Sequence, residues 1–186
     1  MPEIINKNYQ PHKAMLILGN TKELMVVQKK HPDLLRECFL LVSHIEIWMM
    51  LRDKGYDIKF RSEYFSEDDY KLIRERGRYL SKNWYNSFRY NLVYKDIDLA
   101  EMWRIENNFF FMEVVASNIA VKRIFEQEKP SEIIVVGKPK TICADKTRYN
   151  GENDVFKEIA IGLAYKNGIS VNIIGDEKYV QHFKNI

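Results

Sequence analysis

The chain has 186 residues, 46% of them apolar and 30% charged, with a formal net charge of +3. This composition is typical of one folded domain with a sizeable core, and no stretch approaches the ~18–20 uncharged apolar residues of a membrane helix. Basic residues are interleaved with acids, as in 52–78, which argues against a dedicated nucleic-acid surface. The N-terminal residues lack the apolar core of a secretory signal, so we expect a cytoplasmic protein.

The cysteines and histidines do not indicate a metal site. Cys38 and Cys143 form no CxxC pair, and neither has metal-like spacing with the four histidines. A disulfide or zinc site is therefore not expected, and Cys38, within an apolar run, is interpreted as a buried small hydrophobic residue. No metal and no cofactor are predicted.

In chain order, residues 1–12 are a polar appendage, and Ala14–Leu18 is the first strand-like run. The run is wholly apolar, as expected of a strand covered on both faces. Gly19 and Asn20 follow it, and they can lead into a helix or form a hairpin turn. For residues 14–28, a strand–helix unit and a hairpin both stay open.

Four more strand-like runs follow, three of them directly after a helix that is stopped by Gly or Pro. These stops are Gly55, Pro130 and Gly168, because glycine suits a helix C-terminus and proline cannot continue a helix. Strands alternating with helices predict right-handed crossovers. The predicted fold is therefore a three-layer, doubly wound, mainly parallel α/β sheet of about five strands, which is Rossmann-like. Its later strands are Phe39–Ser43, a short run after Gly55, Ile133–Val136 and Val171–Ile174.

Residues 66–129 differ, and they are predicted to form a long helical insertion or crossover. Ser66 and Asp69 make a capping-box-like helix start. Gly77 lies on the apolar face of that helix, which indicates either close approach of another backbone or a weak point. A second helix is expected from near Asp98 to the end of the region, covered on two sides because its apolar residues exceed one face. Its inner stripe comprises Met102, Ile105, Phe109, Met112, Ala116 and Ile119.

Candidate ligand-binding residues lie where the predicted strands end. In open α/β sheets, ligands collect at the carboxyl ends of strands, and loops there present N–H groups to anions. The basic turn from Gly137 to Thr141 is a candidate phosphate site, although it matches neither GxGxxG nor a Walker loop and also fits a solvated strand exit. The predicted ligand-binding residues are Gly19, Asn20, Ser43, Gly137, Lys138, Lys140, Thr141, Thr147 and Asn150.

His44 is the candidate catalytic residue. It follows the strand Phe39–Ser43, and a histidine at the carboxyl edge can act as a general base. No nucleophile elbow, Ser-His-Asp order or metal partner accompanies it, so a plain helix-start residue is the alternative interpretation. Aromatic residues of the middle third, such as Tyr79 and Trp84, are interpreted either as core or as a platform for sugars or bases.

Residues 38–175 resemble a known enzyme family. The segment 48–85, beginning "WMMLRDKGYDIKF", is similar to the N-terminal pattern of bacterial and archaeal surface-polysaccharide glycosyltransferases. In that pattern a helix ending in Lys-Gly leads to a short strand and a Ser-capped helix ending in Trp. The segment 98–137 is similar to their Leu-x-Glu helix, which closes with Lys-Pro before a strand, and 159–175 looks like the helix–strand unit that follows.

The resemblance implies an enzyme of two Rossmann-like halves, the GT-B type, in which the N-terminal half usually holds the acceptor and the C-terminal half binds the nucleotide-sugar. The chain corresponds to the acceptor half, so we expect it to bind a sugar or phosphate-linked acceptor and to lack transfer alone. A larger protein or a partner chain would supply the other half. Whether the chain is itself an enzyme stays open.

Two alternatives to this function also stay open. The first is a stand-alone module of the same fold that binds a nucleotide or phosphate. The second is a non-catalytic interaction protein that forms a homodimer through its aromatic helices. The basic turn and the polar loop after it depart from the shorter glycine/acid loop expected in the glycosyltransferase family, so the resemblance does not assign the acceptor-site residues.

Overall fold

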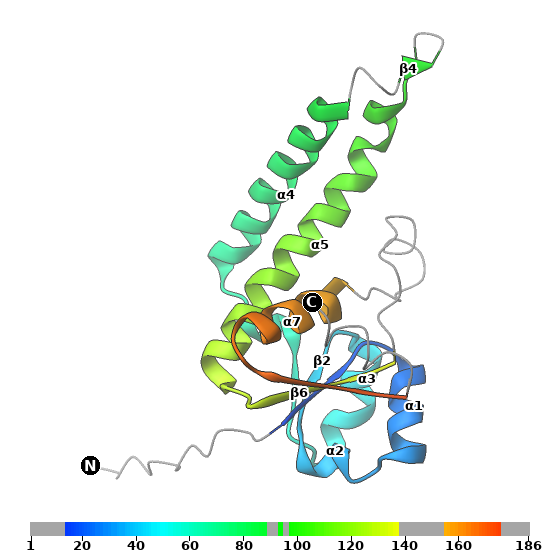
Figure 1. Cartoon of the computed structure of the whole chain (residues 1–186), viewed down its shortest axis with the longest axis vertical. Coiled ribbons are helices and arrows are strands. Elements are labelled where there is room, and N and C mark those ends of the chain that lie inside the picture. Colours follow the sequence, from blue (N-terminus) through cyan, green and yellow to red (C-terminus); the bar gives the residue numbers. More distant parts are fainter. Residues whose placement is uncertain (1–13, 89–92, 95–96, 138–154, 176–186) are drawn as a thin grey trace, which may run out of the picture.

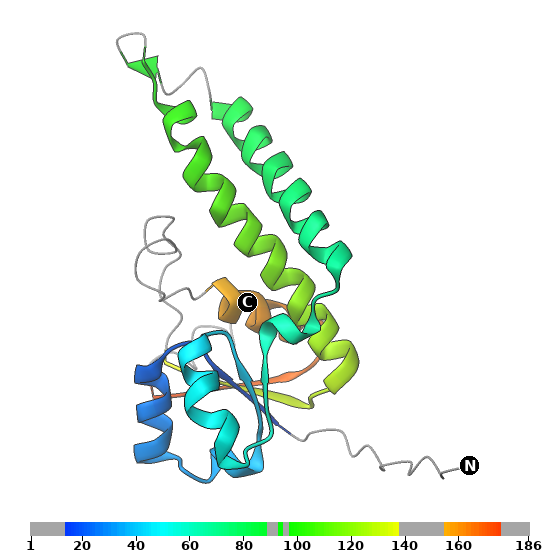
Figure 2. The ribbon, with the colours of Figure 1, turned by 180° about the vertical axis from the view of Figure 1, so that it is seen from behind.

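The computed structural model describes residues 14–88, 93–94, 97–137 and 155–175. Its centre is a five-stranded sheet in the order β3-β2-β1-β6-β7, in which all neighbouring strands are parallel. Helices lie on both faces of this sheet (Figures 1 and 2). The predicted Rossmann-like three-layer fold is confirmed. The strands are β1 Met15–Leu18, β2 Phe39–Val42, β3 Ile58–Phe60, β6 Glu132–Val136 and β7 Ser170–Ile174.

The central strands are apolar, apart from Glu132 at the start of β6, because each contributes to two cores. Even-numbered residues of β1, β2 and β6 pack with one set of helices, and odd-numbered residues pack with another. Successive side chains of a strand point to opposite faces, so a strand with helices on both sides must be apolar at every position. The first core includes α1 Thr21–Lys30, α2 Leu34–Glu37 and α3 Ile45–Leu51, and the second includes α5 Leu99–Glu128 and α7 Val155–Lys166.

The first strand leads into a helix and not into a hairpin. Asn20 is the N-cap of α1, and its Oδ1 accepts a hydrogen bond from the backbone N–H of Glu23 at 3.0 Å. This bond satisfies one of the amides that every helix leaves free at its N-terminus. The hairpin alternative for residues 14–28 is therefore wrong, because Gly19 and Asn20 serve helix capping.

The predicted helix stops are confirmed by the backbone. Gly55 follows the 3₁₀ helix η1 Arg52–Lys54 with φ 76°, and Gly168 follows α7 with φ 69°. Only glycine occupies this left-handed region without strain. At the third stop Lys129 itself has φ 46°, directly before Pro130.

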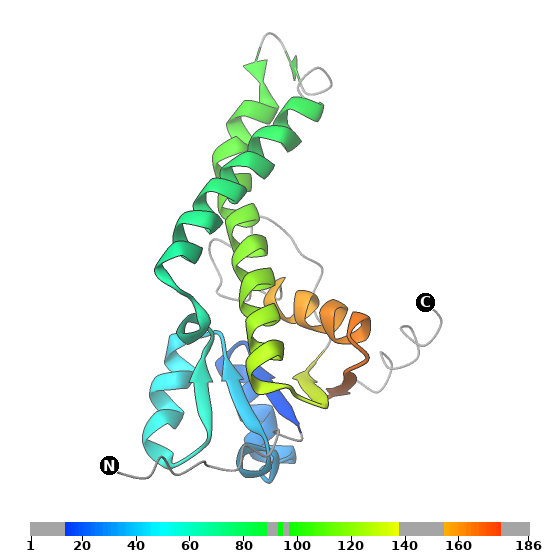
Figure 3. The same ribbon diagram turned by 90° about the vertical axis from the view of Figure 1, so that its left-hand side faces the viewer.

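A long helical hairpin, which lies between β3 and β6 in the sequence, projects from the sheet (Figures 1 and 3). After the 3₁₀ helix η2 Arg61–Tyr64, it consists of α4 Glu67–Phe88 and α5, with 22 and 30 residues. The short antiparallel strands β4 Val93–Tyr94 and β5 Ile97–Asp98 lie between the two helices along the chain. This hairpin is the predicted helical insertion.

Gly77 marks the closest approach of the two hairpin helices. A Cβ added at this position would lie 2.3 Å from Met112 Cγ and 3.1 Å from Met112 Cα. Such distances leave no room for a side chain, so the close-approach interpretation of Gly77 is confirmed and the weak-point alternative is wrong.

The expected burial of α5 is only partly correct. Phe109, which was placed in the inner stripe, is 55% exposed. Complete burial begins only toward the C-terminal half, at Val115, Ser117 and Ala120. The described residues nearer the N-terminus of α5 are exposed or half-buried. In this part the hairpin has left the sheet, and α4 is the main neighbour of α5. Coverage on two sides therefore holds only where α5 also packs on the sheet.

The base of the hairpin is fastened by a buried acid. Asp69 Oδ2 accepts hydrogen bonds from Ser66 N and Ser66 Oγ at 2.6 and 2.7 Å, and Arg123 of α5 donates to Asp69 Oδ1 at 2.8 Å. Burial acts to raise the pKa of Asp69, but the Ser66 hydrogen bonds and the Arg123 guanidinium together lower it below its ordinary value of 3.8. The ionised carboxylate therefore stabilises the fold.

We expect Asp69→Asn to lower the free energy of unfolding by about 2 kcal/mol near neutral pH. Because the folded pKa lies below the unfolded pKa, the carboxylate's contribution is complete above the unfolded value and is lost as the pH falls through the folded value. In urea unfolding at several pH values, the stabilities of both proteins should therefore converge at acidic pH, as the pH falls through the lowered pKa of Asp69. The neighbouring exposed change Asp68→Asn should cost less than about 1 kcal/mol, and a constant Asp69→Asn effect at all pH values would contradict this account.

Further polar pairs join η2 and β3 to α5. Arg61 forms a two-pronged ion pair with Glu113, which also accepts a hydrogen bond from Ser117 Oγ at 3.1 Å. Glu128 Oε1 accepts from Lys59 Nζ at 2.7 Å and from the Tyr64 hydroxyl at 2.6 Å. These contacts fix the direction in which the hairpin leaves the sheet.

Cys38 is 4% exposed and carries a free thiol, as predicted for a buried small hydrophobic residue. Burial, followed by the negative charges of Glu37 and Glu132, raises the pKa of this thiol to about 11. Within the described ranges, no helix combines the length and apolarity needed to cross a bilayer.

Candidate functional site

The chain connections change direction between the neighbouring strands β1 and β6. From β1 the chain crosses to β2 over one face of the sheet, whereas from β6 it crosses to β7 over the other face. The two connections diverge at the carboxyl ends of these neighbouring strands, which is the topological switch point where α/β sheets bind ligands. Gly19 and Asn20 follow β1 there, and Gly137 follows β6.

A buried ion pair lies at this switch point. Lys157 Nζ of α7 donates to Glu23 Oε1 of α1 at 2.6 Å, and the two side chains are 4% and 10% exposed. Glu23 Oε1 also accepts from Asn20 Nδ2 at 2.7 Å, and Glu23 Oε2 accepts from the Gly19 backbone N–H at 2.7 Å. The pair therefore joins helices from opposite faces of the sheet at the end of β1.

The carboxylate of Glu23 occupies the position that a phosphate takes in many Rossmann-like folds. The turn after the first strand usually offers free backbone N–H groups to an anion. In this chain the Gly19 N–H already donates to Glu23, and Lys157 neutralises the same carboxylate. An external phosphate would have to displace the Glu23 carboxylate from the Gly19 N–H, so this turn is better suited to a neutral ligand that donates a hydrogen bond.

Ser43 and His44 lie at the neighbouring end of β2. The Ser43 N–H donates to the Leu18 carbonyl at 3.3 Å, which places the β2 end beside the β1 end. His44 is the N-cap residue of α3, makes no side-chain capping bond, and has a side chain that is 34% exposed. Its Nδ1 is buried without a hydrogen-bond partner and lies 3.9 Å from Glu46 Oε2.

The structure thus brings together five of the ten predicted site residues at three adjacent strand ends. The rim they form is half-buried and polar, and it consists of Gly19, Asn20, Ser43, His44 and Gly137. The other five lie outside the described residues, and they are Lys138, Lys140, Thr141, Thr147 and Asn150. No group of three or more His, Cys, Asp or Glu side chains with metal-site geometry occurs in the described part of the chain.

Sequence reasoning missed Glu23 and Lys157. A signal for Glu23 was present, because Asn20 followed three residues later by Glu23 is a capping-box pattern. Nothing marked Lys157, which stands in an amphipathic segment among apolar neighbours. The pairing joins positions 134 residues apart, so only the fold could reveal it.

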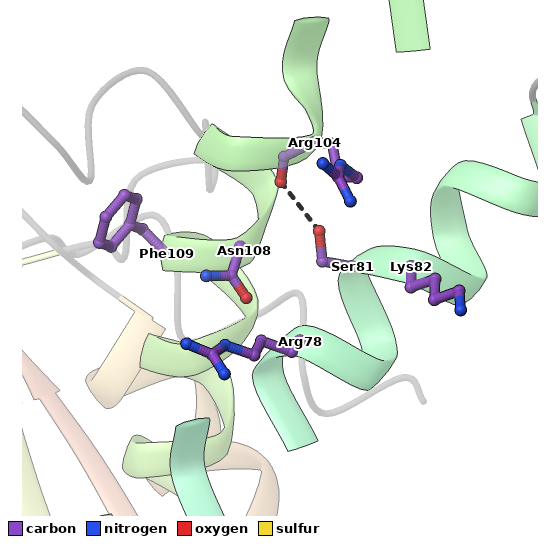
Figure 4. Close-up of a pocket in the computed structure, with 6 residues that line it drawn as sticks. All are labelled: Arg78, Ser81, Lys82, Arg104, Asn108 and Phe109. Atoms are coloured by element: carbon purple, nitrogen blue, oxygen red, sulfur yellow. Dashed lines mark hydrogen bonds between the residues drawn. The ribbon is translucent and has the colours of Figure 1, made fainter. Parts of the chain in front are cut away.

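A basic pocket and an apolar groove lie on the helical hairpin, away from the strand ends. The pocket measures about 350 Å³ and is lined by Arg78, Ser81, Lys82, Arg104, Asn108 and Phe109 (Figure 4). The groove measures about 480 Å³, and its lining includes Leu72, Tyr79, Leu80, Val115 and Ile119. Comparisons of the chain with protein-family models, curated proteins and solved structures gave no match.

Proposed function

We propose that the chain is an acceptor-binding domain of the kind found in surface-polysaccharide glycosyltransferases, and that its ligand is a sugar held at the carboxyl ends of β1, β2 and β6. The observation that carries the proposal is the Glu23 carboxylate at the β1–α1 turn, bonded to the Gly19 N–H and to Lys157. It favours a ligand that donates hydrogen bonds over one that brings negative charge.

Sugar hydroxyls suit such a site because each can donate to one acceptor and accept from another donor. Asn20 Nδ2 donates to Glu23 and Asn20 Oδ1 accepts from the Glu23 N–H, so the first turn of α1 is rigid. A rigid polar rim loses little entropy when it binds a ligand. Ser43 and His44 add a hydroxyl and an imidazole on the β2 side of the rim.

In this proposal His44 is the candidate general base for the acceptor hydroxyl. Proton removal from an attacking hydroxyl requires a base within hydrogen-bond reach, and the His44 side chain is 34% exposed at the end of β2. Transfer itself would need a second domain for the nucleotide-sugar, because one sheet presents one carboxyl edge and cannot enclose both substrates. Residues 1–186 alone should therefore bind without turnover.

The first alternative, a nucleotide- or phosphate-binding module, has less support at the β1–α1 turn. There the Glu23 carboxylate already accepts the hydrogen bond of the Gly19 N–H. The basic residues after Gly137 lie outside the described residues and stay a prediction. The second alternative is dimerisation through the aromatic helices. Tyr79 is compatible with it, because this side chain lines the apolar groove and is 67% exposed.

The test is thermal unfolding of the full chain with neutral monosaccharides, such as glucose, galactose, mannose and N-acetylglucosamine, and with UDP as the anionic comparison. A ligand that binds only the folded state should raise the melting temperature by several degrees at saturation. In His44→Ala, the sugar concentration that gives half of the maximal shift in melting temperature should rise about tenfold, since one hydrogen bond to the ligand is lost.

His31→Ala is the matched control, because His31 is the C-cap residue of α1 at the opposite edge of the sheet. It should leave the sugar response unchanged. A response to UDP alone that depends on His44 would instead support the phosphate-binding alternative. If no monosaccharide shifts the melting temperature, the acceptor-binding proposal is wrong.

A further inference from the structure

The apolar groove of the hairpin is open to solvent along its α4 wall. Tyr79 is 67% exposed there, and Leu72 and Leu80 are each 36% exposed. The apolar residues of the facing α5 wall are Val114, Val115 and Ile119. Helix α4 stands away from the sheet, with α5 as its main neighbour (Figures 1 and 3). Large apolar side chains gathered at an exposed groove mark an interaction surface.

Two cations in the lining of the groove have no charged partner. Arg76 of α4 and Lys122 of α5 are both exposed. Neither forms an ion pair or a side-chain hydrogen bond in the described part of the chain, which includes every residue of 66–84 and 107–137. A molecule that fills the groove should therefore combine apolar side chains with carboxylates.

Helix α4 itself carries apolar side chains and carboxylates together. Asp68 lies four residues before Leu72 and Glu75 lies three residues after it, so both acids share the side of the helix on which Leu72 stands. Both acids are exposed, and within the described ranges neither forms an ion pair. This side of α4 is therefore acidic up to Glu75 and basic at Arg76.

We propose that the chain forms a homodimer with two-fold symmetry, in which α4 of each copy lies in the apolar groove of the other. The two α4 helices run antiparallel, so Asp68 and Glu75 of each copy face the cations Arg76 and Lys122 of the other copy. A parallel arrangement would instead bring like charges together. The two hairpins then form a four-helix bundle, which covers the apolar side chains that one hairpin leaves exposed.

A second copy is favoured over a different protein because one surface carries both halves of the charge pattern. Each copy supplies the cations of a groove and, on the helix that enters the other groove, the acids that neutralise them. An isologous contact of this kind closes after two copies. The dimer involves the hairpin and not the strand ends, so it does not depend on the function proposed there.

Sedimentation velocity of the full chain at about 1–100 μM measures the oligomeric state directly. The mass should rise with concentration to twice the single-chain value of 22.2 kDa. A chain that keeps the single-chain mass over this whole range overturns the proposal, whether or not sugars raise its melting temperature.

Charge reversal tests the antiparallel pairing. Asp68→Lys/Glu75→Lys makes this side of the hairpin wholly basic, and Arg76→Glu/Lys122→Glu makes it wholly acidic. Each variant alone should dimerise at least about tenfold more weakly than the unchanged chain, because like charges then meet across the two-fold axis. An equal mixture of the two variants should dimerise again, since opposite charges face each other. A mixture as weak as its components overturns the pairing.

Arg74→Glu/Arg78→Glu is the matched control for charge. It makes the same change of charge on α4 at two exposed positions outside the groove, and it should change the dimer dissociation constant by less than about twofold. Far-UV circular dichroism checks that every variant folds. If this control weakens the dimer as much as Arg76→Glu/Lys122→Glu does, the effect is general repulsion and the proposal is wrong.

Tyr79→Ala tests the apolar contact without changing charge. It should weaken the dimer at least about tenfold, because an exposed tyrosine that becomes buried at an interface contributes strongly to binding. Phe109→Ala is the control, since Phe109 is an aromatic residue of the same hairpin, is 55% exposed and lies outside the groove. It should leave the dimer unchanged, and equal losses in the two variants would contradict docking in this groove.

Discussion

Lys157→Met should lower the free energy of unfolding by about 3–5 kcal/mol, the cost of leaving a buried charge without its partner. Methionine keeps the length and apolar volume of the side chain but cannot neutralise Glu23, whose carboxylate is 10% exposed. The measurement is urea unfolding followed by circular dichroism. Lys166→Met, on the exposed last turn of the same helix, should cost less than about 1 kcal/mol.

A double-mutant cycle separates the ion pair from general damage to α7. Glu23→Gln/Lys157→Met removes both charges, so it should be more stable than the sum of the two single changes predicts, by about 1–3 kcal/mol. If Lys157→Met proves as mild as Lys166→Met, the pair is not buried in solution. The Glu23 carboxylate would then no longer argue for a neutral ligand at the switch point.

Gly77→Ala should destabilise the protein by about 1–3 kcal/mol although alanine is the better helix former. The added Cβ would lie 2.3 Å from Met112 Cγ and 3.1 Å from Met112 N. The methionine side chain can move, but the backbone of α5 can yield only if the two helices separate. Gly77→Val should cost more, because its branched side chain requires a larger separation and is itself unfavourable in a helix. Thermal or urea unfolding of both variants provides the measurement.

Gly162 supplies the control for this prediction. It also lies inside a helix, α7, but a Cβ added there has no atom within 4 Å. Gly162→Ala should therefore stabilise the protein by about 0.5–1 kcal/mol. Equal effects at the two glycines would contradict close packing of α4 against α5.

The architecture could be predicted from the sequence because strands buried on both faces must be apolar at every position. The strands β1 and β2 have this property, and β6 has it after Glu132, whereas the edge strand β7 carries the exposed polar residues Ser170 and Asn172. Glycine or proline follows the helices that precede β3, β6 and β7. The capping residues at the start of α4 and the close approach of a second backbone at Gly77 could also be predicted from the sequence, since each depends on local backbone geometry. The same local rules left residues 14–28 ambiguous, because Gly19-Asn20 suits a turn as well as a helix start.

What the sequence by itself determined is therefore the set of elements, their order, and the strand ends where a ligand could bind. Only the tertiary structure decided that Glu23 and Lys157 meet at the switch point, that Phe109 faces solvent, and that Arg78 and Arg104 line one pocket. The physical reason is that burial patterns and capping act within a few residues. Contacts between distant side chains depend on how whole helices are placed, which no single segment encodes.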